Sequence, residues 1–203
     1  MKKFMLRSIT AMFIAVIFYS CQSVFRLYTG VKNKIVIYQT NEERQAYYAS
    51  FISAVNEANV KVYTLKDKEL DSIIGTINTL AKNMPLMYLK NTETQSLYRL
   101  SCYEDITYDI ENIINDKYSW DYLDKDSISN QYLNQQKYIN KNFEVSFDNE
   151  SKQDSVAKWD VLYVGGSFLG KKLRKRSLPA FKIEGLRNVS IVDLSVNKNT
   201  SSE

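Results

Sequence analysis

Short apolar runs alternate with segments of helical periodicity between residues 34 and 115, and this alternation restricts the fold more than any other feature. The run Ile35–Tyr38 is apolar without alternating faces, which is typical of a strand buried on both sides. Thr40 and Glu43 form a capping-box pattern, so a helix is expected from there to about Ala58. The predicted apolar stripe of this helix consists of Ala46, Ala49, Phe51, Ile52 and Val55.

The alternation continues with a strand, a helix, two strands joined by a polar turn, and a last helix. Pro85 marks the end of the second helix, because proline disfavours helical geometry in the residue before it. The predicted elements are strands 60–65, 86–89 and 96–103, helices 68–82 and 105–115, and a turn at 91–95. Two parallel strands joined through a helix, followed by an antiparallel hairpin and a covering helix, indicate the α/β class.

This element order, the opening strand and the Met84-Pro85 step resemble the thioredoxin/glutaredoxin family over residues 34–115. The resemblance implies a thioredoxin-like central sheet with flanking helices, and it places Pro85 where the family keeps its cis-proline. A generic αβ sandwich is the alternative. The family's reactive cysteine pair would lie between the first strand and the first helix, where a helix N-terminus lowers a thiol pKa. No cysteine is present there, so dithiol exchange by the family mechanism is excluded.

What the resemblance leaves is the backbone edge beside the proline, which members of the family use to hold an extended peptide. We therefore expect a redox-inactive domain that binds a peptide or protein partner. Helix capping is the simpler role for the two glutamates of the first turn. The predicted partner-binding residues are Thr40, Asn41, Glu42, Glu43, Met84 and Pro85.

The first twenty residues are typical of an export signal. A basic lead with Lys2, Lys3 and Arg7 precedes a mostly apolar run that ends at Ser20-Cys21. The position of Cys21 resembles a bacterial lipoprotein signal, which implies lipidation of this thiol, although Tyr19 is larger than the usual residue. An uncleaved anchor and simple secretion are the alternatives. Each of the three places the body outside the cytoplasm. The lipoprotein signal implies a lipid-anchored body in the cell envelope that faces the periplasm, and it does not identify which membrane holds the anchor.

The chain contains no histidine, which removes the commonest general base and the commonest zinc ligand. Without the three basic residues of the leader, 24 basic and 23 acidic side chains remain, so nothing favours nucleic acid. No metal, cofactor or nucleotide is expected. Cys102 shares a strand face with Leu100 and Tyr98, which favours a buried, inert thiol over a reactive one.

The C-terminal half adds strands at 142–148, 159–164 and 188–196, expected as a β-rich extension of the sheet or a small subdomain. Residues 165–172 (GGSFLGKK) nearly match a phosphate-binding loop, with Asp193 on the following strand. The magnesium-binding Ser/Thr is replaced by Lys172, and Pro179 would shorten the helix, so a glycine turn is the preferred interpretation. Five of the six residues at 171–176 are basic: Lys171, Lys172, Arg174, Lys175 and Arg176.

This basic run is interpreted as a solvated loop or as a surface that contacts anionic phospholipid headgroups. The predicted organisation is a lipoprotein-type signal peptide (1–20), a tether (21–33), a thioredoxin-like domain (34–115), a connector (116–141), a β-rich extension (142–196) and a tail (197–203). The expected function is that of a membrane-tethered lipoprotein that binds a polypeptide partner. A histidine-free enzyme using Cys102 or a carboxylate, and a structural envelope component, are the alternatives.

Overall fold

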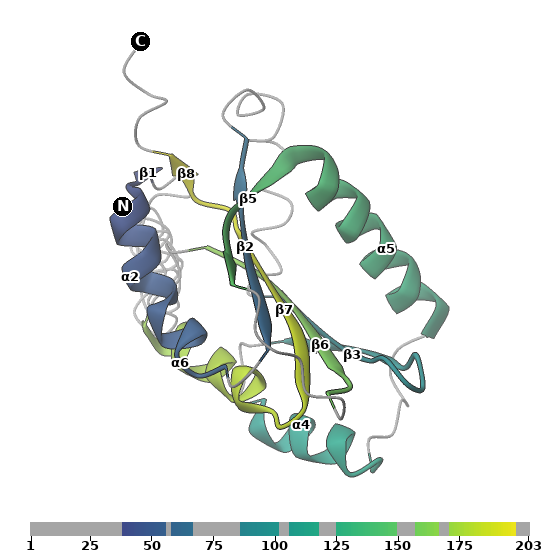
Figure 1. Cartoon of the computed structure of the whole chain (residues 1–203). Helices are drawn as coiled ribbons and strands as arrows, with labels where there is room; N and C mark the ends of the chain where they lie inside the picture. The colour runs from purple at the N-terminus through teal and green to yellow at the C-terminus, as the bar shows by residue number, and fades with distance from the viewer. Residues whose placement is uncertain are drawn as a thin grey trace, which may run out of the picture.

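The structure is a computed structural model that describes residues 38–55, 58–66, 86–101, 106–117, 125–149, 157–166 and 171–197. It is a mixed α/β fold, as the sequence predicts (Figure 1). The described strands are β1 (Tyr38–Gln39), β2 (Asn59–Leu65), β3 (Leu86–Asn91), β4 (Leu97–Ser101), β5 (Phe143–Asn149), β6 (Trp159–Gly165), β7 (Leu186–Asp193) and β8 (Val196–Asn197). The described helices are α2 (Asn41–Ile52), α4 (Thr107–Ile114), α5 (Lys125–Asn142), α6 (Lys171–Ser177) and the 3-10 helix η2 (Leu178–Lys182).

Six strands form one sheet in the order β4-β3-β6-β7-β2-β5. The central strands β6, β7 and β2 are parallel to one another, whereas β3, β4 and β5 pair antiparallel with their neighbours. Because β6 has neighbours on both sides and helices on both faces, almost every residue from Trp159 to Gly165 is buried. The predicted strands 60–65, 86–89, 142–148 and 159–164 are therefore confirmed within a residue or two.

The strand order differs from the arrangement predicted for residues 34–115. Of the expected first strand the structure describes only Tyr38, which pairs with Val196 in a separate two-stranded sheet. In the main sheet β2 lies between β7 and β5, and β3 lies between β4 and β6. The strands predicted as a C-terminal extension, β6 and β7, lie in the middle of the main sheet instead. The structure nevertheless contains a parallel pair joined through a helix, β6–α6–β7, next to the antiparallel hairpin β3–β4.

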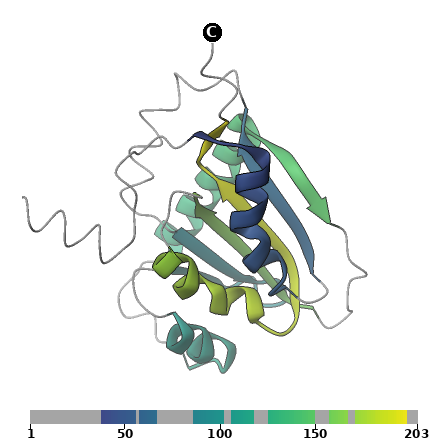
Figure 2. The ribbon, with the colours of Figure 1, turned by 90° about the vertical axis from the view of Figure 1, so that its left-hand side faces the viewer.

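Helices cover both faces of the sheet (Figures 1 and 2). On one face α2, η2 and α4 pack over residues such as Val62, Met87 and Tyr163. On the other face α5 packs through Ile128 and Ile139. The predicted connector is thus largely an 18-residue helix.

Helix α2 begins at the predicted capping box. The Glu43 backbone N–H donates to the Thr40 hydroxyl at 3.2 Å, and the Thr40 backbone N–H donates to the Glu43 carboxylate at 2.9 Å. The predicted stripe is only partly correct, because Ala46 and Ala49 are exposed. The buried side chains of α2 are instead Arg44, Tyr48 and Phe51.

Candidate functional site

A buried ion pair joins α2 to the carboxyl end of β7. Arg44 Nε donates to Asp193 Oδ2 at 2.6 Å, and the two side chains are 5% and 0% exposed. The backbone N–H and the hydroxyl of Ser195 donate to Asp193 Oδ1 at 2.9 and 2.5 Å, and Arg44 Nη2 donates to the Ser195 carbonyl at 3.3 Å. The Asp193 carboxylate is therefore held by internal donors on both oxygens, which suits a structural role rather than proton transfer.

Two tyrosines of α2 lie next to this pair. The hydroxyls of Tyr47 and Tyr48 are buried and make no well-formed hydrogen bond with the described residues. Burial raises the pKa of Tyr48 well above its ordinary value, and the negative charge of Asp193 adds to the increase. Burial also raises the pKa of Tyr47, against the opposing charge of Arg174. Burial therefore favours the neutral form of both phenols.

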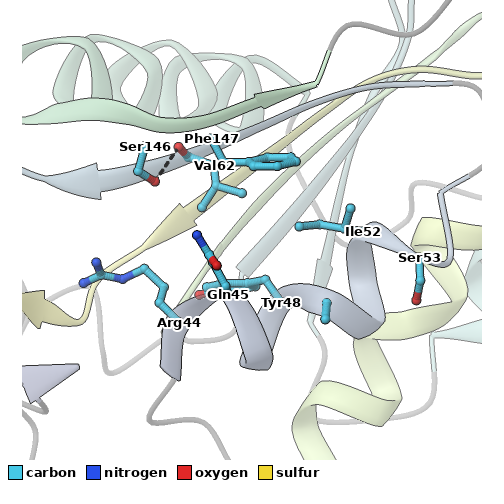
Figure 3. A pocket seen from close by; sticks show the side chains of 9 residues that line it. Arg44, Gln45, Tyr48, Ile52, Ser53, Val62, Ser146 and Phe147 are labelled. Carbon is cyan, nitrogen blue, oxygen red and sulfur yellow. Dashed lines mark hydrogen bonds between the residues drawn. The ribbon is translucent and has the colours of Figure 1, made fainter. Parts of the chain in front are cut away.

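A cleft of about 490 Å³ opens between α2 and the strands β2 and β5 (Figure 3). In Figure 3 Gln45 points across the cleft toward Val62, whereas Arg44 points away from it. The residues that line the cleft are Arg44, Gln45, Tyr48, Ala49, Ile52, Ser53, Val62, Ser146 and Phe147.

A β-bulge shapes the strand side of the cleft. Val62 pairs with Phe147 and Tyr63 pairs with Val145, which leaves Ser146 as an extra residue on β5. The bulge brings both Ser146 and Phe147 to the cleft, and the Ser146 hydroxyl donates to the Val62 carbonyl at 3.1 Å. Strand β5 is also the edge of the main sheet in the part of the chain that the structure describes.

The cleft has the chemistry of a binding site for an apolar group. Its walls come mainly from Ile52, Val62, Phe147 and the ring of Tyr48, and Gln45 supplies an amide that can donate and accept hydrogen bonds. Its volume falls within the range of about 300–1,000 Å³ that is usual for ligand pockets. Across the described ranges, no group of three or more Cys, Asp or Glu side chains is arranged to hold a metal ion.

The predicted basic surface is divided between two environments. Arg174 turns inward, with its guanidinium 5.0 Å from the centre of the Tyr47 ring and Nη1 donating to the Tyr47 carbonyl at 3.5 Å. Lys172, Lys175 and Arg176 instead line a groove of about 910 Å³ between α4 and α6–η2. The basic run is therefore not one continuous patch. The side chain of Lys171 is outside the described part of the structure.

Whether the predicted partner-binding residues come together is not tested by the described structure, because Met84 and Pro85 lie outside it. Thr40 and Glu43 are occupied in capping α2. Glu42 is exposed. A hydrogen bond from its own backbone N–H lowers the pKa of its carboxyl, and a hydrogen bond from the Thr40 hydroxyl lowers it to a smaller extent. Asn41 opens the helix, and its side chain is outside the described residues. Four further positions lie outside them altogether: Cys21, Met84, Pro85 and Cys102.

The resemblance to a phosphate-binding loop gains no support from the geometry. Helix α6 ends at Ser177, and the 3-10 helix that follows carries Pro179 in its first turn. Asp193, which corresponds to the acidic residue of the second strand, is bound by Arg44 and Ser195. Residues 167–170 of the glycine-rich segment lie outside the described residues, so the glycine turn stays a prediction.

Comparisons of the chain with protein-family models, with curated proteins and with solved structures find no match. Within the described residues, no helix is both long and apolar enough to cross a membrane. The functional interpretation therefore depends on the cleft and the groove themselves.

Proposed function

We propose that the protein is a membrane-tethered, extracytoplasmic binding protein whose cleft between α2 and β5 receives an apolar side chain of a polypeptide partner. The observation that supports this most is the cleft itself, in which the partly exposed Ile52 and Phe147 lie over the buried Val62 beside an edge strand of the described sheet. Peptide-binding domains that receive a chain beside a sheet edge take their specificity from pockets for its side chains, and the cleft has the position and the chemistry of such a pocket.

The bulge at Ser146 limits how the partner is held. A bulge interrupts the ladder of an edge strand, so a long added strand is disfavoured along β5. The exposed carboxylates of Glu144 and Asp148 on the same strand also disfavour edge-to-edge pairing. The side chain in the cleft, rather than a continuous backbone ladder, therefore provides most of the binding energy in this proposal.

The tether remains part of the proposal through Cys21 and the export signal before it. The predicted thioredoxin-like arrangement belongs to it only in a modified form, in which β6 and β7 supply the parallel pair beside the β3–β4 hairpin. A peptide-holding role for Met84-Pro85 stays a prediction. Mass spectrometry of the protein from its own envelope tests the tether, with a chain that begins at acylated Cys21 as the expected result.

Filling the cleft tests the binding site. Ala49 lines the cleft and Ala46, on the same helix, does not, and both are exposed, so Ala49→Trp and Ala46→Trp form a matched pair. Peptides selected from a random library against the natural protein are expected to lose affinity for A49W only. Burial of one large apolar side chain contributes about 1.5–3 kcal/mol, so the expected loss is about tenfold to a hundredfold.

Fluorescence anisotropy with a labelled selected peptide provides the measurement, and thermal unfolding verifies that both variants are folded. Equal affinity of the selected peptides for A49W and A46W would contradict the proposed site. If an apolar dye binds the natural protein but not A49W, and no peptide is enriched, the cleft takes a small molecule instead. That second result would keep the site and refute the polypeptide partner.

A further inference from the structure

We propose that the groove between α4 and α6–η2 holds the headgroup of an anionic phospholipid, and so fixes which face of the protein lies against the membrane. The inference extends the proposed tethering, because a tether alone leaves the orientation of the body free. It concerns a different surface from the cleft between α2 and β5, since the two sites share no lining residue.

The groove combines an apolar floor with charged walls. Ile110 and Ile114 of α4 face Leu178, Pro179 and Ile183 of the segment around η2. Ile114 is 44% exposed, so apolar surface is accessible from solvent. The volume of about 910 Å³ is large enough for a headgroup together with the glycerol unit and the first methylene groups of its chains.

Cations outnumber anions along the walls. The four basic side chains that line the groove come from α6 and η2, and the two acidic ones come from α4 and the turn before β7. The groove therefore carries a net charge of +2, from four positive and two negative groups. The lining charges are Lys172, Lys175, Arg176 and Lys182, with Glu111 and Glu184.

The chemistry of a phospholipid matches both features at once. A phosphate diester offers anionic oxygens to lysine and arginine, and its glycerol and acyl carbons can lie on the isoleucines and Pro179. Basic pockets that bind anionic headgroups follow the same rule. An acidic peptide would satisfy the charges too, but the tether proposed above would keep the body close to a membrane, where headgroups are at high local concentration.

Lysine acylation read by mass spectrometry tests the proposal on the full-length chain. The protein is placed with lipid nanodiscs of phosphatidylcholine alone or of phosphatidylcholine with phosphatidylglycerol. Lys175 and Lys182 are expected to react several-fold more slowly when the anionic lipid is present, and added salt should reverse this protection. Lys137 and Lys141 are exposed on α5, over the opposite face of the sheet, and should react equally in both lipids.

Two charge-reversal variants sharpen the test. Lys175→Glu with Lys182→Glu is expected to abolish the lipid-dependent protection of Lys172, whereas Lys137→Glu with Lys141→Glu should leave it unchanged. All four positions are exposed, so both variants are expected to fold, and thermal unfolding verifies this. Protection of Lys172 that survives the groove variant would overturn the proposal.

Other outcomes separate this inference from the tether. Equal reactivity in both lipids would overturn the groove as a headgroup site. Protection by polyglutamate, together with none by phosphatidylglycerol, would overturn it in favour of an acidic polypeptide. If the chain does not co-purify with phosphatidylcholine nanodiscs, the proposed tether is refuted. The groove is still tested in that case, because the phosphatidylglycerol nanodiscs show whether its lysines are protected.

Discussion

Removal of the Arg44 guanidinium should reveal how strongly the buried ion pair holds α2 on the sheet. In Arg44→Met the long apolar stem is largely kept, so the main change is the loss of the charge and its hydrogen bonds. Asp193, with no exposed surface, would keep the two hydrogen bonds from Ser195 and lose the positive charge that lies against it. A buried charge that loses its partner destabilises a protein far more than an exposed one.

The free energy of unfolding of R44M is expected to be about 3–5 kcal/mol lower than that of the natural protein, which is the usual cost of removing one partner of a buried ion pair. For a chain of this size that corresponds to a fall in Tm of about 6–20 °C. The comparison pair is Lys61–Asp148, whose side chains are 40% and 38% exposed at an N–O distance of 3.0 Å. Lys61→Met should cost no more than about 1 kcal/mol, because solvent screens the exposed pair.

Urea unfolding followed by tryptophan fluorescence measures these differences, since Trp159 is buried in the core. A double-mutant cycle with Asp193→Asn isolates the pair from the packing of each side chain. The double variant R44M/D193N should be destabilised by at least about 2 kcal/mol less than the sum of the destabilisations of the two single variants. The reason is that the double variant leaves no buried charge without its partner. Additive losses, or a loss in R44M as small as that in K61M, would refute the reasoning.

Two further predictions follow from buried groups. Gly165→Ala should destabilise the fold by about 1–3 kcal/mol in the same unfolding assay. The added Cβ would lie 2.6 Å from the ring of Tyr163, and this ring is fully buried. Unchanged stability would show that the ring can move. Tyr47 and Tyr48 have raised pKa values in the folded protein, so their contribution to its stability is complete below pH 10 and is lost as the pH rises above 10. Absorbance at alkaline pH should show that these two tyrosines ionise only when the protein unfolds. Ionisation of all 15 tyrosines near pH 10 in the folded protein would contradict this.

Local patterns predict several of the described elements, because these elements depend on their own residues. The predicted helix 68–82 lies outside the described residues, and α2 ends at Ile52 rather than near Ala58. The capping box at Thr40 needs only the chain up to Glu43, and its two hydrogen bonds form as predicted. The polar turn after β3 is likewise local, with the Asn91 side chain accepting from the backbone N–H groups of Glu93 and Thr94.

The site was harder to predict because its decisive contacts join distant parts of the chain. Arg44 lies 149 residues before Asp193, and nothing near either residue identifies the other. An arginine at position 44 interrupts the apolar pattern of α2, so the pattern predicts a buried stripe that includes the alanines instead. The spacing of Arg44, Tyr48 and Phe51 does fit one helix face. An arginine on that face with bulky aromatic neighbours was the available signal for a buried pair.

The strand order shows why neighbours cannot be assigned from apolar runs alone. Residues 35–38, β6 and the end of β7 all carry runs of apolar residues typical of central strands, so periodicity does not decide which of them occupies the centre. Strand pairing decides it. The connection through α6 and η2 brings the chain back to the end of the sheet where β6 begins, so β7 can lie beside β6 and parallel to it. Tyr38 instead pairs with Val196. With β7 central, Asp193 falls at the strand end directly under α2, where Arg44 meets it. The same choice of neighbours therefore produces the ion pair, holds α2 across β2 and β5, and opens the cleft on which the proposed function depends.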